Sequence, residues 1–265
     1  MNAAANNGVP APRFGVADLQ LHTAFGDGMA SAREVLDRVE HQTSLDVIGV
    51  TDHDDVGGAL EARELHARGD YSFELVTGIE VTTRSGHLLA LWVDEPVASF
   101  RPLGETISTI HGAGGLAVIP HPFSYLTRSV GQRALERLLR EDDPRTRPDG
   151  IEVANTSLAG RVTGAKARRL NGERYGLAET GGSDAHFPEE IGKARTLFGG
   201  TTAAELRAEI EAGRTRGLMG DPVPLRAIGV RRLLEQQVRG LSVTPRKVLG
   251  RPLRRVARAL TGGRT

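Results

Sequence analysis

The sequence predicts an α/β fold in which short buried strands alternate with helices. Six short apolar runs lie between residues 14 and 153 with helix-like stretches among them, and histidines or carboxylates stand at or just after several of these runs. Strands that alternate with helices of about ten residues are typical of parallel β/α units. The carboxyl ends of such strands meet at one end of a barrel, where polar side chains can form a functional site.

The predicted elements follow one another along most of the chain. The expected strands are residues 14–21, 47–50, 74–76, 87–93, 116–119 and 150–153. The expected helices are residues 34–41, 56–67, 104–111, 132–139, 164–170 and 203–212. Ser31 and Glu34 form a capping-box pattern that starts the first helix. Residues 86–92 could instead fold back as a hairpin on residues 75–82.

The composition limits the class of protein. The chain has 265 residues, of which 39% are hydrophobic and 25% are charged, as in a soluble globular protein with one large domain or two small ones. It contains no apolar run of about 18 residues, which argues against a membrane-spanning helix. It also contains no cysteine, so disulfides are excluded and nitrogen and oxygen must supply any metal ligands. These features agree with a cytoplasmic protein.

The charge distribution divides the chain near its end. The formal net charge is +1, yet residues 226–265 hold eleven basic residues and a single acidic one, Glu235. A sharp change in charge marks a structural or functional boundary. We therefore expect a disordered lead-in at residues 1–13, a folded domain at residues 14–225 and a basic amphipathic tail at residues 226–265.

Histidines and carboxylates recur in short motifs at the expected strand ends. The motifs are Asp18-Leu19-Gln20-Leu21-His22, Thr51-Asp52-His53-Asp54, Gly78-Ile79-Glu80, Ile119-Pro120-His121-Pro122 and Ser183-Asp184-Ala185-His186. Each motif alone is weak, because a lone histidine is more often a packing or surface residue than a ligand. As an ordered set, they supply the imidazoles and carboxylates that a multinuclear metal hydrolase requires.

Together with Gly26-Asp27-Gly28 and His87, these motifs resemble the polymerase and histidinol phosphatase (PHP) family of metal-dependent phosphoesterases. The resemblance runs from about Gly15 to Phe198. It implies that residues 14–225 form a metallohydrolase domain. The implied fold is a distorted (β/α)7 barrel with divalent ions at the carboxyl end of the strands.

Carried over residue by residue, the resemblance implies up to three ion sites. The implied ligands are His22, Glu80 and Asp184 for the first ion, Glu80, His87 and His121 for the second, and Asp27, His53 and His186 for the third. Neutral imidazoles and carboxylates suit Zn, Mn or Fe, and Mg is also compatible with this set. A carboxylate between two ions can hold a hydroxide, which is nucleophilic at neutral pH because the ions lower the pKa of water toward roughly 7.

Gln20 departs from the family pattern, which has a histidine at this position. An amide oxygen can bind a hard cation but is a poorer zinc ligand than an imidazole. We expect Gln20 among the metal ligands, with three alternatives for the first site. The site could bind its ion weakly, it could prefer Mn or Mg, or it could be vestigial.

Other residues are candidates for catalysis rather than for metal binding. Asp52 is expected to orient a ligand imidazole. His186 could protonate the leaving group in addition to binding an ion. Arg128 lies on an expected loop after a strand and could hold a phosphate bidentately, although it could also be a solvated surface residue. Asn155 and Arg161 could face the same cleft.

The tail shows apolar residues at helical spacing among its arginines, at residues 230–241 and 247–260. A basic amphipathic helix could pack on the acidic domain or on a second copy, contact an anionic membrane or nucleic acid, or remain disordered. The tail has no aromatic residues for stacking on bases, which disfavours sequence-specific binding of single strands.

We therefore expect a metal-dependent hydrolase that cleaves a phosphate ester, in a small phosphomonoester or nucleotide, with a metal-bound hydroxide. Three alternatives remain from the sequence. They are a 5′–3′ exonuclease or phosphoesterase acting on oligonucleotides, a hydrolase of non-phosphate esters or carbamates, and a degenerate PHP module that binds without catalysis.

Overall fold

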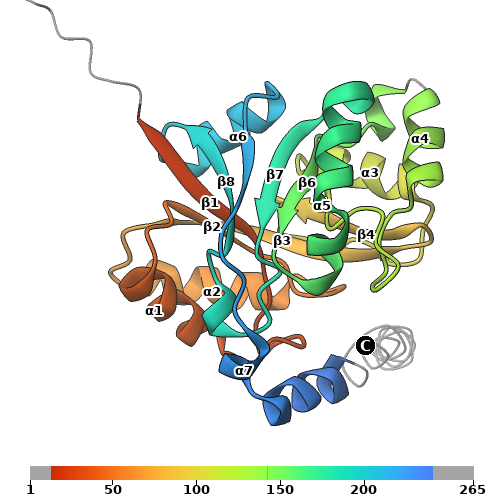
Figure 1. The fold of residues 1–265 in the computed structure, drawn as a ribbon. Helices are drawn as coiled ribbons and strands as arrows, with labels where there is room; N and C mark the ends of the chain where they lie inside the picture. The colour runs from red at the N-terminus through yellow and green to blue at the C-terminus, as the bar shows by residue number, and fades with distance from the viewer. Residues whose placement is uncertain (1–12, 142, 241–265) are drawn as a thin grey trace, which may run out of the picture.

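The computed structural model describes residues 13–141 and 143–240, and its strands form one mixed sheet that curves into a nearly closed barrel (Figure 1). The sheet has nine strands in the order β7-β6-β5-β4-β3-β2-β1-β8-β9. The strands are β1 (Phe14–Leu21), β2 (Val47–Val50), β3 (Glu74–Thr83), β4 (Gly86–Leu91), β5 (Leu116–Ile119), β6 (Gly150–Asn155), β7 (Ala178–Gly182), β8 (Ala194–Gly199) and β9 (Arg216–Met219). The α/β barrel expected from the sequence is therefore confirmed.

Helices connect most of the strands and cover the outside of the barrel (Figure 1). They are α1 (Ala32–Gln42), α2 (Gly57–Arg68), α3 (Leu103–Gly112), α4 (Gln132–Arg140), α5 (Leu158–Leu170), α6 (Ala203–Glu211) and α7 (Leu225–Ile228). The capping box at the start of α1 is present, because Ser31 Oγ accepts from the Glu34 N–H while Glu34 accepts from the Ser31 N–H. Within the described residues, no helix combines the length and apolar character needed to span a membrane.

Two groups of parallel strands are separated by an antiparallel strand. β1, β2 and β3 run parallel, as do β5, β6 and β7, whereas β4 is antiparallel to both β3 and β5. β4 is therefore the second arm of a hairpin with β3, one of the two alternatives that the sequence left open. The turn closes at Gly86, whose φ of +133° favours glycine, and whose carbonyl accepts a hydrogen bond from Thr83 Oγ1.

Strands β7, β8 and β9, none of which was among the strands expected from the sequence, complete the barrel, with β8 and β9 added at its edge. β8 pairs antiparallel with β1, and β9 pairs antiparallel with β8. β7 lies against both added strands, and the Thr215 hydroxyl donates to the Glu179 carbonyl across this contact. The closure places the ends of β1 and β7 side by side, as shown by the bridge between Leu21 and Ala185.

The basic tail begins as a helix at residues 230–240, which follows the short α7. Arg232 forms a bidentate ion pair with Glu189, at 2.7 and 3.2 Å, and its guanidinium lies over the ring of Phe187. The described start of the tail therefore packs on the barrel. The lead-in at residues 1–12 and the tail beyond residue 240 lie outside the described residues.

Candidate metal centre

Four of the expected ligands lie at one end of the barrel because they follow the carboxyl ends of parallel strands. His22 follows β1, His53 follows β2, His121 follows β5 and Asp184 follows β7. His121 and Asp184 have positive φ values of 28° and 57°, which non-glycine residues seldom adopt. Strained backbone of this kind is found where surrounding structure fixes a functional side chain.

Glu80 lies at the middle of this cluster, and its two carboxylate oxygens face different imidazoles. Oε1 lies 2.7 Å from His87 Nδ1 and 3.0 Å from His121 Nε2. Oε2 lies 3.1 Å from His22 Nε2. A carboxylate with ligand groups on both oxygens is suited to bridge two cations, as the family resemblance implied for Glu80.

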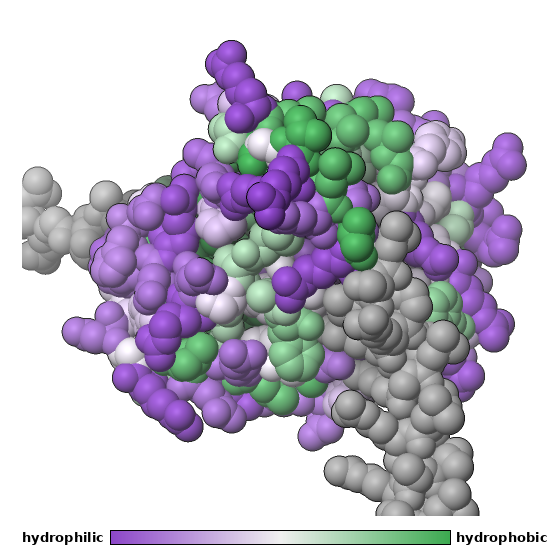
Figure 2. Space-filling view, turned by 90° about the horizontal axis from the view of Figure 1, so that it is seen from below, coloured by the Kyte–Doolittle hydropathy of each residue, from purple (hydrophilic) through white to green (hydrophobic). Residues whose placement is uncertain are grey.

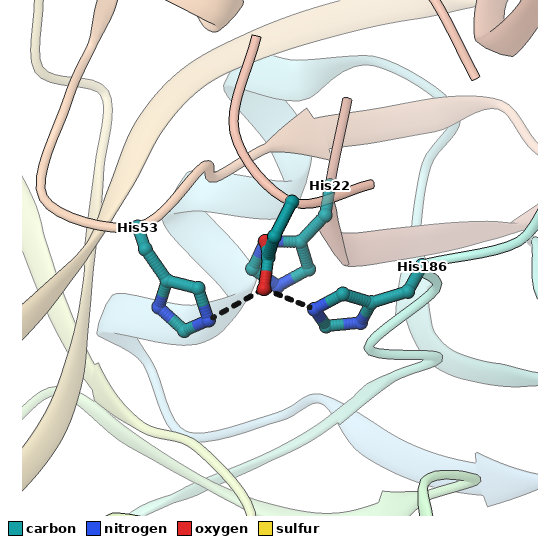
Figure 3. A group of neighbouring side chains, drawn as sticks. His22, His53 and His186 are labelled. Carbon is teal, nitrogen blue, oxygen red and sulfur yellow. Dashed lines mark ion pairs between the residues drawn. The ribbon is translucent and has the colours of Figure 1, made fainter. Parts of the chain in front are cut away.

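A second group of imidazoles converges on the carboxylate of Asp27. Figure 3 shows His22, His53 and His186 directed toward one carboxylate. His186 Nε2 lies 3.3 Å and His53 Nε2 3.9 Å from Asp27 Oδ2, and His22 Nδ1 lies 3.8 Å from Asp27 Oδ1. His22 therefore stands between the Asp27 group and the Glu80 group.

Three sets of side chains in this cluster have ligand atoms close enough to share an ion. In each set, one nitrogen or oxygen per residue lies within 4.8 Å of the others. The sets are His22, Asp27, His53 and His186; His53, Glu80 and His87; and His22, Glu80 and Asp184. The expected groups thus come together. His121 joins through its 3.0 Å contact with Glu80, and His53 also takes part in the second set.

Several buried nitrogen and oxygen atoms of the cluster are suited to bind an ion. Among the described residues, both ring nitrogens of His22, Oδ1 of Asp27 and Nδ1 of His87 make no well-aligned hydrogen bond, although Glu80 lies 2.7 Å from His87 Nδ1 and 3.1 Å from His22 Nε2. Buried polar atoms are nearly always paired, and a site for a bound ion is one physical reason for exceptions. The donor set of imidazoles and carboxylates therefore fits divalent metals.

Hydrogen bonds at the far ring nitrogens direct Nε2 of two histidines into the cluster. His186 Nδ1 lies 3.0 Å from the Asp184 carbonyl, which can only accept, so Nδ1 carries the proton. Ser129 uses its hydroxyl proton for the His121 carbonyl, so its Oγ accepts from His121 Nδ1. Such contacts fix the tautomer that presents Nε2 as a ligand.

The carboxylates of the cluster are held in the charged form. Burial raises the pKa of Glu80, but His53, His87 and His121 outweigh it and hold the pKa well below its usual range. Burial likewise raises the pKa of Asp27, but His186, His53 and His22 lower it by more, so that this pKa lies far below its usual range. Charged carboxylates are the form that binds cations.

The histidines divide into two classes by their pKa. Burial lowers the pKa of His121, but contact with Glu80 raises it by a larger amount, so that the pKa is about 9. Burial and the charge of His22 lower the pKa of His186, but Asp27 and Asp184 raise it to about 9. Burial dominates at His53 and lowers its pKa to about 4. A cation must therefore displace protons from His121 and His186 at neutral pH.

Gln20 lies beside Glu80 in a cluster of amide and carboxyl groups. Gln20 Nε2 donates to Glu80 Oε2 at 3.0 Å, and Gln20 Oε1 accepts from Asn155 Nδ2 at 3.2 Å. Asn155 Nδ2 also donates to Glu152 Oε2, which accepts the His121 N–H as well. Burial raises the pKa of Glu152 to about 8. The sequence analysis named Asn155 as a cleft residue, but it did not connect it to Gln20.

Asp52 is placed to support the loop that carries the ligands. Its Oδ1 accepts from the Thr23 N–H at 2.8 Å and its Oδ2 from the Thr23 hydroxyl at 2.6 Å. Asp54 supports the next strand in the same way, through two hydrogen bonds from Thr82. These two contacts of Asp52 fix the backbone next to His22, and its role in orienting a ligand imidazole stays a prediction.

Arg128 lies in the exposed segment that follows His121. Its carbonyl accepts the His87 N–H, so the segment passes close to the cluster. Its guanidinium lies 5.8 Å from the centre of the Phe100 ring. In the same segment Tyr125 and Leu126 are 99% and 61% exposed. Arg161, on α5, is also exposed.

The tail helix lies against the loop that carries Asp27. Arg239 donates to the carbonyls of Ala24 and Gly26. A Cβ added at Gly240 would lie 3.3 Å from Asp27 Oδ2, so the helix backbone approaches this carboxylate closely. Figure 2 looks onto this face and shows exposed apolar side chains gathered beside polar ones. The start of the tail is therefore part of the surroundings of the centre.

Comparison with known proteins agrees with this arrangement. A family model described as PHP-associated matches residues 166–215. An uncharacterized protein of Methanocaldococcus jannaschii is 30% identical over 150 residues, which cover 52% of this chain and 81% of the relative. A 3′,5′-nucleoside bisphosphate phosphatase of Chromobacterium violaceum is 26% identical over 262 residues, covering 66% of this chain and 89% of the relative.

The fold also resembles solved structures. One is a two-domain protein of Bacteroides vulgatus that contains a predicted PHP-like metal-dependent phosphoesterase. The two chains superpose with a TM-score of 0.64 and are 18% identical. The match covers 79% of this chain and 66% of the other chain, which is just under two thirds of its length. At this identity, the likeness concerns the fold.

Proposed function

Because the chain belongs to the PHP family of metal-dependent phosphoesterases, we propose that this hydrolase cleaves the phosphate ester of a small phosphomonoester or a nucleotide. The observation that carries the proposal is the position of Glu80. Its two oxygens lie 2.7 to 3.1 Å from nitrogens of His87, His121 and His22, as expected of a carboxylate between two cations. The bisphosphate phosphatase activity of the Chromobacterium violaceum relative supports a nucleotide substrate.

Divalent ions would be held by the three sets of ligands around Glu80 and Asp27. When bound, they would lower the pKa of water toward roughly 7 and neutralise charge that develops on a phosphoryl oxygen. The protein keeps Glu80 and Asp27 charged and presents Nε2 of His121 and His186 for this purpose. His186 uses Nδ1 to donate to a carbonyl and Nε2 to face Asp27, so we assign it to ion binding rather than to protonation of the leaving group.

Arg128 is the proposed anchor for the substrate phosphate. It is exposed, it follows a ligand histidine, and stacking on Phe100 restricts its guanidinium. A planar guanidinium can bind two phosphate oxygens at once, which lysine cannot do. We expect Arg128→Lys to raise KM by about tenfold with a smaller change in kcat, as for an interaction worth about 1.4 kcal/mol. An unchanged KM would rule out this anchoring.

The proposed function is tested by a substrate screen with defined metals. Protein stripped with a chelator is loaded with Zn²⁺, Mn²⁺ or Mg²⁺ and assayed on p-nitrophenyl phosphate, nucleoside monophosphates and 3′,5′-bisphosphates. We expect phosphate release that depends on the added metal. Cleavage of p-nitrophenyl acetate without cleavage of the phosphate would overturn the proposal in favour of a non-phosphate esterase.

The same screen includes short oligonucleotides, because the tail is basic and oligonucleotides are the main alternative substrate. Binding through phosphates weakens steeply as salt rises. Salt-sensitive cleavage of oligonucleotides that exceeds the activity on mononucleotides would replace the proposal by an exonuclease. A membrane contact or a homo-oligomer formed through the tail stays a prediction.

A further inference from the structure

The surroundings of Gln20 show what this residue does in place of the family histidine. Gln20 is fully buried, and its neighbours Glu152 and Asn155 are each only 2% exposed. A Cβ added at Gly182 would lie 2.3 Å from Glu152 Oε1 and 2.9 Å from the Gln20 Cβ. The glycine therefore allows a close approach, and the three polar side chains are packed in a fixed arrangement.

The direction of the hydrogen bonds in this cluster is set by a backbone group. The N–H of Ser157 can only donate, and it donates to Asn155 Oδ1 at 3.0 Å. The Ser157 hydroxyl approaches the same oxygen at 2.6 Å. The Asn155 amide is thereby oriented with its Nδ2 on the opposite side, where it contacts Gln20 and Glu152.

The orientation of Asn155 in turn determines that of Gln20. Because Asn155 Nδ2 is a donor, the Gln20 atom that it contacts at 3.2 Å must be the oxygen. The Gln20 nitrogen then faces Glu80 Oε2 at 3.0 Å. If the Gln20 amide were reversed, its nitrogen would face the donor Asn155 Nδ2 and its oxygen would face the acceptor Glu80 Oε2. Both contacts would then become repulsive.

We propose that Gln20 is a positioning residue for Glu80 rather than a metal ligand, and that the ion held by His22, Glu80 and Asp184 is bound more weakly than the others. An N–H has no lone pair for a cation, so the first site has three protein ligands where a histidine at position 20 would supply a fourth. The hydrogen bond from Gln20 instead fixes the carboxylate of Glu80. This inference rests on the proposed metal-dependent function.

Stepwise binding of Mn²⁺ to the full chain tests this inference without an activity assay. Equilibrium dialysis with elemental analysis gives the number of ions and the affinity of each. We expect the wild type to bind one ion at least about tenfold more weakly than the rest, because changes around metal ligands typically alter affinity by 10–100-fold. Gln20→His should bring this ion into the tight class, and Gln20→Leu should leave the number of ions unchanged.

A second substitution acts on the direction of the hydrogen bonds. Asn155→Asp keeps the size of the side chain but cannot donate to Gln20, so the Gln20 amide is free to turn its oxygen toward the first ion. We expect the weakest affinity to rise about tenfold, as for a restored ligand contact. The matched control is the double variant Gln20→Leu, Asn155→Asp. It carries the same added charge but has no amide at position 20 that could turn. A smaller rise in this background than in the wild type supports the role of the Gln20 orientation.

The outcomes separate this inference from the proposed function. Equal affinities in the wild type, with one ion lost in Gln20→Leu, would identify Gln20 as a ligand and overturn the inference alone. Equal rises from Asn155→Asp in both backgrounds would also overturn it. The absence of bound metal in both the wild type and Gln20→His would overturn the proposed function and the inference with it. Thermal melting by circular dichroism shows whether each variant is folded.

Discussion

On one side of the candidate metal centre three imidazoles meet around Asp27, whereas on the other side the amide of Asn155 and the carboxyl of Glu80 contact Gln20. The side chains of His53 and His186 are 17% and 18% exposed, and the loop that holds Asp27 is contacted by the tail helix. Gln20 is fully buried and accepts a hydrogen bond from Asn155, whose own oxygen accepts from the N–H of Ser157 just before α5. The imidazole side is thus partly open to solvent, whereas the amide side is buried.

The difference indicates that a position in a sequence motif can keep its location in the fold while the side chain at that position takes a different chemical role. At position 22, just after β1, both histidine nitrogens make no well-aligned hydrogen bond, and two residues earlier, within β1, an amide donates a hydrogen bond. Both side chains face Glu80, which belongs to both sides of the centre. Variants of the shared residue, of the imidazole side, of the tail that contacts this side, and of the amide side should therefore have effects of decreasing size on ion binding and activity.

Glu80→Gln should have the largest effect, because it removes the charge that both sides share. Loss of ion binding costs several kcal/mol of transition-state stabilisation, which corresponds to a decrease in kcat/KM of about 10³-fold or more. Steady-state assays and elemental analysis of the purified variant provide the measurement. Glu179→Gln is a matched control, because this carboxylate pairs with Arg168 away from the centre. Full ion content in Glu80→Gln would contradict the bridging position.

Asp27→Asn should affect the imidazole side alone. The substitution removes the charge on which His53 and His186 converge, while the contacts of Glu80 with His87 and His121 remain. We expect one ion fewer per chain and a decrease in kcat/KM of roughly 10²-fold, smaller than for Glu80→Gln. Metal content measured alongside activity separates the two effects. If Asp27→Asn lost every ion, the two sides would not be independent.

The gathering of several candidate ligands at one end of the barrel could be predicted from the sequence because they follow the ends of strands. His22, His53 and His121 each follow a short apolar run, and parallel strands bring such ends together whatever the details of packing. The orientation of Gln20 could not be predicted. It depends on Asn155, which is 135 residues away in sequence, and on the N–H of Ser157.

Parts of the fold were also beyond sequence reasoning. β8, with the sequence Ala-Arg-Thr-Leu-Phe-Gly, is short and carries none of the motif residues, and its pairing with β1 arises only when the barrel closes. The β3–β4 hairpin was one of two alternatives because the apolar runs alone do not set strand direction. The tight turn at Gly86 determines it. Contacts distant in sequence, rather than local patterns, decided these cases.

Arg239→Ala tests whether the tail helix supports the imidazole side. The arginine donates to the carbonyls of Ala24 and Gly26, which precede Asp27. Its removal should loosen this loop and weaken one ion by about tenfold, since outer partners of metal ligands typically contribute 10–100-fold. Mn²⁺ dialysis measures this change. Arg231→Ala is the control, because Arg231 pairs with Glu235 within the same helix. An equal loss in both variants would point to a general effect of charge.

Glu152→Gln should have the smallest effect, and it concerns the stability of the metal-free protein on the amide side. Burial raises the pKa of Glu152 from 4.5 to about 8. Between these two values the folded state binds more protons than the unfolded state, so the free energy of unfolding falls as pH rises toward 8. Glutamine retains an acceptor for the His121 N–H and cannot ionise.

The variant should therefore gain on the order of 2–3 kcal/mol over the wild type when the pH is raised from 6 to 8.5, since about two pH units lie below the folded pKa of about 8 and each corresponds to about 1.4 kcal/mol. Urea unfolding in the presence of chelator, at both pH values, measures the difference. A gain that is the same at both pH values would mean that Glu152 is already charged at pH 6. The amide side would then carry a negative charge beside Glu80, and the asymmetry between the two sides would be smaller than the hydrogen bonds indicate.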